Sequence, residues 1–300
     1  MEPLSPDAAA PPRAVATRVS VVIATRDRNA LLQATLRQLG ALPEAPDVHV
    51  VDDGSRDDTV AALAACFPGV AVTALPASRG AAARNVGVAA CAGPYVALTD
   101  DDAHWAPGAL ARAAAILDAH PLVALVAPRV LVGPHEREDP VNVAMARGGL
   151  RGDPLLPGEP VVGFVACAAV VRRSAFLEVG GFDARYGMGG EERRLALDLA
   201  AAGWELRYVP SVVAHHRPPP AHGRAGRRAS TLRNDLWTAW LRRPPGSAAR
   251  ESVRLVRALG LRRETAAGVG AALAGAAWVA RERSVVPPRV EGWLTALDGA

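Results

Sequence analysis

The regular alternation of buried strands with amphipathic helices constrains the fold of this chain more than any other feature. Four short apolar segments rich in β-branched residues suit strands that are covered on both faces, at residues 18–24, 47–53, 70–75 and 95–102. Helical patterns follow them at residues 25–40, 54–67, 78–93 and 107–120. This order predicts an α/β fold with a mostly parallel central sheet and helices on both faces.

Polar clusters follow three of the predicted strands at the point where each strand ends. The clusters read "ATRDR" after the first strand, "DDGS" after the second and "TDDD" after the fourth. In open α/β sheets, ligands bind in the crevice at the carboxyl ends of the strands. We therefore expect these polar residues to converge on one binding site.

The fourth strand ends in three consecutive carboxylates, Asp100, Asp101 and Asp102. Neighbouring carboxylates repel one another and raise each other's pKa, so the cluster needs a compensating charge. Mg²⁺ and Mn²⁺ prefer oxygen ligands, and Mg²⁺ is commonly held by one or two carboxylates together with substrate phosphates. The cluster thus predicts a Mg²⁺ or Mn²⁺ site that serves a diphosphate-bearing ligand.

The absence of lysine from the 300 residues excludes several reaction classes. A Walker-type phosphate loop and Schiff-base chemistry both need a lysine. A sugar nucleotidyltransferase remains an alternative, although the chain lacks a Gly-rich start. A phosphatase with an aspartyl nucleophile in "VDDGS" or "LTDDD" is disfavoured because it would also want a lysine.

The motifs "VSVVIATRDR", "VVDDGSRDDT", "SRGAAARNVG", "YVALTDDD" and "GGFDARYGMGGEERRLALDLAAAGWELRYVPSVVAHH" occur in this order along the chain. As a set they resemble the family 2 glycosyltransferases of the GT-A fold. The resemblance implies a catalytic domain over 18–216, with a nucleotide-sugar-binding half (18–133) and an acceptor half (134–216). A helical extension over 217–300 follows it.

The resemblance also assigns the residues that would bind the nucleotide sugar. Ala24, Thr25 and Arg26 match the strand end that holds the base, where Arg26 replaces the family's usual aromatic residue. A planar guanidinium can still stack on a base. Asp53 matches the residue that hydrogen-bonds the base, and Arg79 matches a basic residue near the base or the phosphates.

The same resemblance assigns the metal site and the ribose contact. Asp100 and Asp102 match an Asp-x-Asp signature, in which Asp102 would ligate the metal and Asp100 or Asp101 would hold the ribose hydroxyls. A histidine that reaches the metal is implied at the end of "SVVAHH". Neighbouring residues of a strand point to opposite faces, so only one of the two histidines should reach it, and His215 is the one we predict rather than His216.

Two glutamates open a predicted helix after a glycine-rich turn, in "GMGGEERRLALDLAAAG". Acids in a first helical turn also interact favourably with the helix dipole, which is the simpler explanation for both. In the family, the second acid resembles the general base that deprotonates the acceptor hydroxyl. We predict that Glu192 is this base and keep Glu191 as the alternative, and the family implies inversion at the anomeric carbon.

The remaining segments carry weaker signals. Residues 1–17 are rich in Pro and Ala and predict a disordered leader, and the long polar segment 134–160 predicts a loop beside the acceptor site. Residues 217–300 hold 15 Arg against 6 acids, whereas residues 1–216 hold 19 Arg against 24 acids. The Trp- and Arg-containing helical patterns in 229–263 suit either a membrane interface or packing against the catalytic domain or a second subunit of a homodimer.

These features predict a metal-dependent inverting glycosyltransferase that uses a UDP-, GDP- or dTDP-linked donor. The acceptor is a hydroxyl compound, with a lipid-linked one as an option, in polysaccharide, glycolipid or natural-product glycosylation. A catalytically inactive sugar-nucleotide-binding protein is a further alternative. The three separate cysteines suit a reducing cytoplasm, with a peripheral position at the inner face of the plasma membrane as an option. No platform of aromatic and basic residues indicates nucleic acid as a partner.

Overall fold

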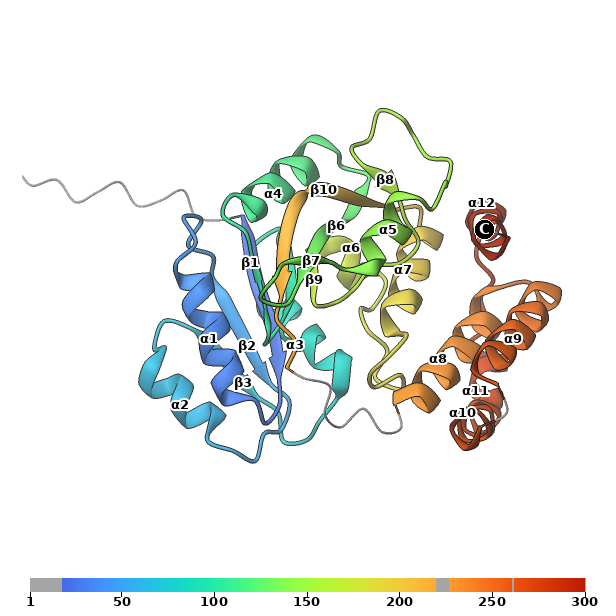
Figure 1. Cartoon of the computed structure of the whole chain (residues 1–300), viewed down its shortest axis with the longest axis horizontal. Helices are drawn as coiled ribbons and strands as arrows, with labels where there is room; N and C mark the ends of the chain where they lie inside the picture. The colour runs from blue at the N-terminus through green and yellow to red at the C-terminus, as the bar shows by residue number, and fades with distance from the viewer. Residues whose placement is uncertain (1–17, 220–226, 261, 300) are drawn as a thin grey trace, which may run out of the picture.

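The computed structural model describes residues 18–219, 227–260 and 262–299. The leader predicted at residues 1–17 lies outside this range. The described chain forms an α/β body followed by a helical C-terminal region, which Figure 1 shows on one side of the body. The predicted fold class is therefore confirmed.

A single mixed sheet runs through the body, with the strand order β3-β2-β1-β4-β9-β6-β10-β5. Its strands are β1 (Val19–Thr25), β2 (Val48–Asp52), β3 (Ala71–Ala74), β4 (Tyr95–Asp100), β5 (Ala103–Trp105), β6 (Val123–Val132), β9 (Ala168–Arg172) and β10 (Glu205–His216). Two short strands join it outside this path, β7 (Arg137–Glu138) beside β6 and β8 (Glu159–Pro160) beside β10.

The four strands that the sequence predicted, β1 to β4, form a parallel half of the sheet. Strands β1, β2, β3 and β4 pair in the same direction, with Val21 opposite Val48 and Ala24 opposite Asp100. Beyond β4 the direction changes, because β9 lies antiparallel between β4 and β6. The carboxyl ends of β1, β2 and β4 consequently meet at one edge of the sheet, where the polar clusters lie.

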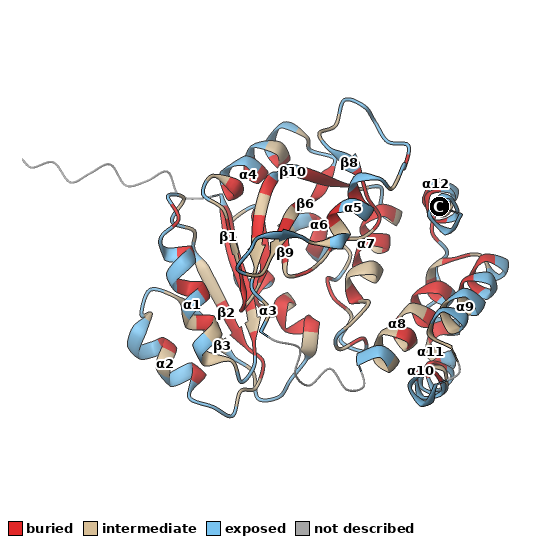
Figure 2. Ribbon diagram, in the orientation of Figure 1, coloured by how far each residue is buried: buried red, intermediate tan, exposed pale blue. Residues whose placement is uncertain are grey.

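Helices cover both faces of the sheet (Figure 2). The first face carries α1 (Asn29–Gly40), α2 (Thr59–Cys66) and α4 (Ala109–Ala119), whose buried leucines include Leu32, Leu63 and Leu110. The second face carries η1 (Gly80–Ala82), α3 (Ala83–Ala90), α6 (Arg173–Glu178) and α7 (Glu191–Ala201). Because each fully buried leucine contributes about 1.5–3 kcal/mol, these two cores hold the strand ends in place.

The segment expected to be a loop, 134–160, contains a helix, α5 (Pro140–Ala146). Its start has a local cause, since the Asp139 carboxylate accepts a hydrogen bond from Val141 N at 2.9 Å and Pro140 occupies the first turn. The buried Asn142 then bonds both the N–H and the C=O of Val130 in β6. The expectation of an unstructured loop is therefore wrong for this part of the segment.

The described residues of the C-terminal region form the helices α8 (Arg227–Arg242), α9 (Pro245–Leu259), α10 (Arg263–Ala274), α11 (Ala276–Arg281) and α12 (Pro288–Asp298). Helices α8, α10 and α11 enclose a small core of their own around Trp237. Helix α12 instead returns to the body, where Val290, Trp293 and Leu294 join the core of the second sheet face. The C-terminal region is thus part of the same packed structure as the predicted catalytic domain.

Candidate active site

Asp101 ties the end of β4 to the end of β1. Its carboxylate accepts hydrogen bonds from Thr25 Oγ1 at 2.7 Å and from Arg28 Nη1 at 2.5 Å. Burial raises the pKa of Asp101 to about 6, although Arg28 and Thr25 act in the opposite direction. Asp101 is only 3% exposed, so its carboxylate bonds to groups of the protein and not to a ligand. Arg28 belongs to the strand-end segment "ATRDR", but nothing in the sequence indicated that it would bond to Asp101.

Asp102 faces the end of β10. Its Oδ1 atom lies 3.3 Å from His216 Nε2 and accepts no hydrogen bond from the described residues. Burial alone would raise the pKa of Asp102, but His216 and Arg28 outweigh burial and lower it. Burial alone would likewise lower the pKa of His216, but Asp102 outweighs it and the pKa is raised. This pair offers one oxygen and one nitrogen donor at the crevice.

His215, which the sequence favoured for the metal, points elsewhere. Its Nδ1 atom lies 3.2 Å from Glu136 Oε1, and its ring stacks on His104 with 4.9 Å between the ring centroids. The alternation of side chains along β10 puts the two histidines on opposite faces, as expected. The choice between them could not be made without the register of β10, which sets His216 opposite Ala103.

Asp100 is the most accessible of the three strand-end carboxylates, with 29% of its side chain exposed. It pairs with the guanidinium of Arg84, a buried residue of α3. Burial alone would lower the pKa of Arg84, but Asp100 and then Glu192 and Glu191 raise it. Arg84 therefore lies within electrostatic reach of both predicted parts of the site. An arginine in an Ala-rich helix was the only sequence signal for this residue.

The carboxylate of Asp53 accepts hydrogen bonds from other residues of the protein. Its two carboxylate oxygens accept hydrogen bonds from Ser78 Oγ at 2.5 Å, from Arg79 N at 2.6 Å and from Gly80 N at 3.1 Å. This residue therefore holds the loop that leads into η1. Of the other residues predicted to hold the base, Arg26 and Arg79 are exposed and Ala24 is half-buried, whereas Thr25 is buried and its hydroxyl donates to Asp101.

The two predicted glutamates begin α7, as the sequence indicated. The preceding Gly189 and Gly190 have φ values of 96° and 86°, a conformation that suits glycine. Glu191 is only 3% exposed, and burial and then the charge of Glu192 raise its pKa to about 7. Glu192 is less buried and lines a pocket.

The C-terminal region holds the turn in front of these glutamates. Asn234 of α8 is fully buried, and its Nδ2 donates to Tyr186 O at 2.8 Å and to Gly189 O at 2.6 Å. On the other side, Ala81 N donates to Gly187 O at 2.9 Å, which connects the turn to the loop that Asp53 holds. Sequence reasoning missed Asn234, because nothing in "TLRND" relates it to a turn so far away in the chain.

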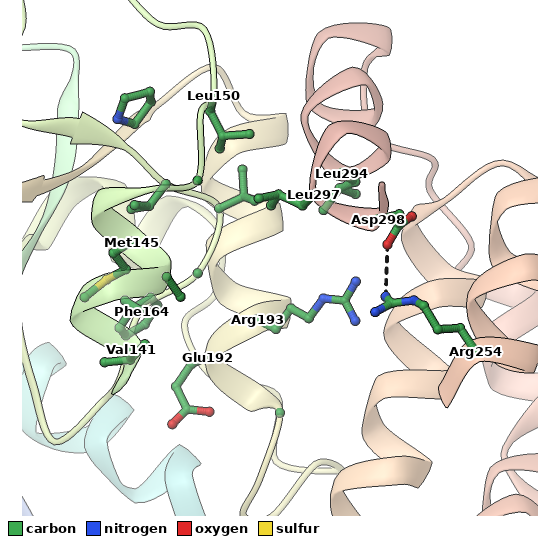
Figure 3. Close-up of a pocket in the computed structure, with 17 residues that line it drawn as sticks. Val141, Met145, Leu150, Phe164, Glu192, Arg193, Arg254, Leu294, Leu297 and Asp298 are labelled. Carbon is green, nitrogen blue, oxygen red and sulfur yellow. Dashed lines mark hydrogen bonds and ion pairs between the residues drawn. The ribbon is translucent and has the colours of Figure 1, made fainter. Parts of the chain in front are cut away.

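A pocket of about 410 Å³ opens beside Glu192. Figure 3 shows this side chain at the start of α7, with apolar side chains above it and Arg193, Arg254 and Asp298 to one side. Its apolar lining comes from α5, from the chain around 148–164 and from α12. The position of Glu192 allows a carboxylate to meet a hydroxyl compound bound in this pocket.

The residues present are compatible with a divalent cation that is bound jointly with a diphosphate. Among the residues that the structure describes, no group of three or more His, Cys, Asp or Glu side chains could hold a metal ion. Asp102 and His216 supply at most two ligands, and Oδ1 of Asp102, which accepts no hydrogen bond from the described residues, is one of the two ligand atoms. A hard cation that takes its other ligands from phosphates and water suits such an incomplete set.

The sheet, its strand-end acids and the two glutamates define a GT-A glycosyltransferase fold. Solved structures share this fold, and two of them illustrate the similarity. The mannosyltransferase PcManGT from Pyrobaculum calidifontis, in complex with GDP-Man and Mn²⁺, has a TM-score of 0.60 at 23% identity, over 98% of this chain and 90% of that one. S. aureus TarS 1–349 with UDP-GlcNAc has a TM-score of 0.64 at 14% identity, over 92% and 83% of the two chains.

The sequence model of glycosyl transferase family 2 matches residues 20–180. The chain belongs to glycosyl transferase family 2, a family of glycosyltransferase enzymes. A pre-mycofactocin glycosyltransferase of Mycobacterium tuberculosis is 40% identical in an alignment of 215 residues that covers 66% of this chain and 43% of the relative. The N-acetylglucosaminyl-diphospho-decaprenol L-rhamnosyltransferase of the same species is 31% identical in an alignment of 289 residues that covers 79% of this chain and 92% of the relative. The chain thus spans less than half the length of the first relative.

Proposed function

We propose that this protein transfers a sugar from a nucleotide-diphosphate donor to a hydroxyl acceptor. One observation carries the proposal: the buried Arg84 pairs with Asp100 at the strand ends, and the charges of Glu192 and Glu191 help to raise the pKa of this arginine. A donor at the strand ends and an acceptor in the pocket would then meet where these groups converge. Family membership supports this reaction class.

The donor binds across the ends of β1, β2 and β4 in this proposal. Asp100, rather than the buried Asp101, holds the ribose hydroxyls, since only Asp100 keeps part of its carboxylate accessible. Arg26 stacks on the base, and Arg79 lies near the base or the phosphates. Asp53 acts through the loop that it holds and does not contact the base itself.

Asp102 and His216 would hold Mg²⁺ or Mn²⁺ together with the diphosphate. When bound, the cation supplies Lewis-acid stabilisation of the leaving diphosphate. The complex of the similar mannosyltransferase PcManGT contains Mn²⁺, which supports a divalent metal. His216 replaces His215 in this assignment, because His216 is the histidine beside Asp102.

Glu192 acts as the general base. Its carboxylate takes the proton of the acceptor hydroxyl while the acceptor oxygen forms a bond to the anomeric carbon, and the bond from that carbon to the diphosphate oxygen breaks. A single in-line displacement of this kind inverts the anomeric centre. Glu191 is the weaker candidate, since it is buried and does not line the pocket.

The test is a screen of nucleotide sugars with and without Mn²⁺, in which release of the nucleotide and of the sugar are both measured. We expect one donor to be turned over, with transfer to an added hydroxyl compound or to water. A sugar nucleotidyltransferase would instead release pyrophosphate from a nucleoside triphosphate and a sugar phosphate. An inactive binding protein would bind the donor, detected as a thermal shift, and release nothing.

A second, independent proposal concerns a membrane surface. No helix within the described residues is long and apolar enough to cross a membrane. Arg250, Val253 and Arg257 lie on one exposed face of α9, at the spacing of an interfacial helix. We propose that this stripe contacts anionic lipid, which would also suit a lipid-linked acceptor and a cytoplasmic protein at the membrane's inner face.

Co-sedimentation with vesicles that contain phosphatidylglycerol tests the membrane contact. Replacing Arg250 and Arg257 by Gln removes two charges from the stripe, and we expect weaker binding by about 1 kcal/mol per charge. Replacing Arg26 and Arg56 by Gln, two exposed arginines of the catalytic body, is the matched control. Equal binding of both double variants and the unmodified protein would contradict the proposal.

A further inference from the structure

We infer that the acceptor is a hydroxyl compound with an uncharged apolar body, and that the C-terminal helix α12 selects it. The inference rests on the proposed function, since it names the class of compound that the Glu192 pocket admits. The evidence lies in the walls of the pocket, in the charges at its rim and in the part that α12 contributes.

Two walls of the pocket are apolar. The first is made by α5 and the chain that follows it, with Val141, Met145 and Leu150, and by Phe164 further along. The second comes from α12, where Leu294 and Leu297 face the first wall across the pocket (Figure 3). A compound whose hydroxyl reaches Glu192 therefore places its remaining atoms between apolar surfaces.

The apolar face of α12 continues past the contacts that the protein itself makes. Val290, Trp293 and Leu294 recur at helical spacing and are 2%, 8% and 4% exposed, because they pack on the body. Leu297 is the next position on that face, yet it remains 37% exposed and lines the pocket. This leucine has apolar surface that a ligand in the pocket would cover.

The arginines at the rim carry no free positive charge. Arg193 Nη2 lies 2.5 Å from Glu251 Oε1, and Arg254 Nη2 lies 2.9 Å from Asp298 Oδ1. Glu251 is fully buried and also pairs with the buried Arg243. Arg193, Arg254 and Arg243 together face the three carboxylates of Glu251, Asp298 and Glu291, so this network has no surplus positive charge that would favour an anionic ligand over an uncharged one.

Gly163 provides a way to fill the pocket without disturbing the packing. It lines the pocket, its φ is not positive, and a Cβ atom added to it would meet no atom within 4 Å. Gly69, an exposed glycine before β3, has the same free space and lies outside the pocket. Gly163→Leu and Gly69→Leu are therefore a matched pair of blocking and control variants.

Binding of 1-octanol and 1-butanol, measured by saturation-transfer NMR, tests the ligand class without any turnover. We expect tighter binding of 1-octanol, because each buried methylene tightens binding about fourfold. Gly163→Leu should weaken 1-octanol binding at least tenfold, and Gly69→Leu should leave it unchanged. Equal binding of 1-octanol to all three proteins would place the alcohol elsewhere and overturn the inference.

Turnover with the two alcohols tests the acceptor role. With a donor that the protein uses, we expect more alkyl glycoside relative to free sugar from 1-octanol than from 1-butanol, and loss of that preference in Gly163→Leu. An unchanged preference in Gly163→Leu, with donor still consumed, overturns the inference alone. If no donor is consumed by any variant although 1-octanol binds as expected, the proposed function fails, and the acceptor role fails with it.

Discussion

His216 Nε2 lies 3.3 Å from Asp102 Oδ1, at the point where the ends of β4 and β10 meet. The antiparallel pairing of β5 with β10 causes this approach, because it sets His216 opposite Ala103, the residue that follows Asp102. His215 is turned to the other side, toward Glu136 and His104.

Replacing His216 by Asn should raise the Mn²⁺ concentration needed for half-maximal turnover by about tenfold or more, the range for loss of a supporting group at a metal site. His215→Asn is the matched control, since it removes the neighbouring imidazole from the same strand, and its metal dependence should stay unchanged. A metal titration of nucleotide release measures both. A raised Mn²⁺ requirement in His215→Asn, with none in His216→Asn, would instead make His215 the metal ligand.

Replacing Asp102 by Asn should reduce metal-dependent turnover by at least 100-fold, because a neutral amide neither balances the charge of a cation nor pairs with His216. Asp47→Asn is the control: Asp47 is exposed and lies before β2, at the opposite end of the strands from the site. Turnover at saturating Mn²⁺ is the measurement. Full activity of Asp102→Asn would remove this residue from the site.

Replacing Glu192 by Gln should lower kcat by 10²–10⁴-fold, the usual contribution of a general base. Donor affinity should hardly change, because the residue lines the acceptor pocket. Steady-state rates together with donor titration separate the two effects. Glu191→Gln, with a smaller fall in kcat, is the comparison that distinguishes the two carboxylates, and a larger fall there would exchange their roles.

Glu191 should make the protein less stable at alkaline pH. Its pKa in the folded protein, about 7, exceeds its ordinary value of 4.5, so the folded state binds the proton more tightly than the unfolded state. The free energy of unfolding therefore falls as the pH rises from about 4.5 through 7, by up to about 3 kcal/mol.

Urea unfolding at pH 5 and pH 8 measures this loss. Glu191→Gln should lose less stability than the unmodified protein between these two values, because it has no proton to release. Glu264→Gln, which changes an exposed glutamate of α10, should keep the full loss. Identical pH profiles for all three proteins would show that Glu191 ionises normally.

Replacing Asn234 by Ala should lower kcat and stability, although this residue lies in the C-terminal region. The change removes the donor to Gly189 O, and a buried carbonyl left unpaired costs about 1–3 kcal/mol, whereas Tyr186 O loses one donor and keeps the bond from Arg233 Nη2 at 2.8 Å. Because the turn before Glu192 loosens, kcat should fall while donor affinity holds. Ser252→Ala on α9 is the control. Equal kcat values in both variants would mean that Asn234 contributes to stability and not to catalysis.

The order of strands and helices through the first 120 residues could be predicted from the sequence, except for the short strand β5. β-Branched segments that are buried on both faces, and helical leucine spacing such as that of Leu32, Leu36 and Leu39, depend on neighbouring residues only. The position of the acids at the strand ends followed from this order. Local patterns determined these features because parallel strands joined by helices have few ways to pack.

Which of the candidate site residues bond within the protein, and which stay accessible, depends on contacts between segments that are distant in the sequence. Asp101 and Asp53 match binding positions in sequence, yet Thr25 and the 78–80 loop take up their carboxylates. The choice of His216 over His215 required the register of β10, and Asn234 reached its turn only through the packing of α8. The sequence by itself determined the fold class and the chemical groups available, whereas the tertiary structure decided which of them face solvent and the pocket, since exposure depends on the whole packed chain.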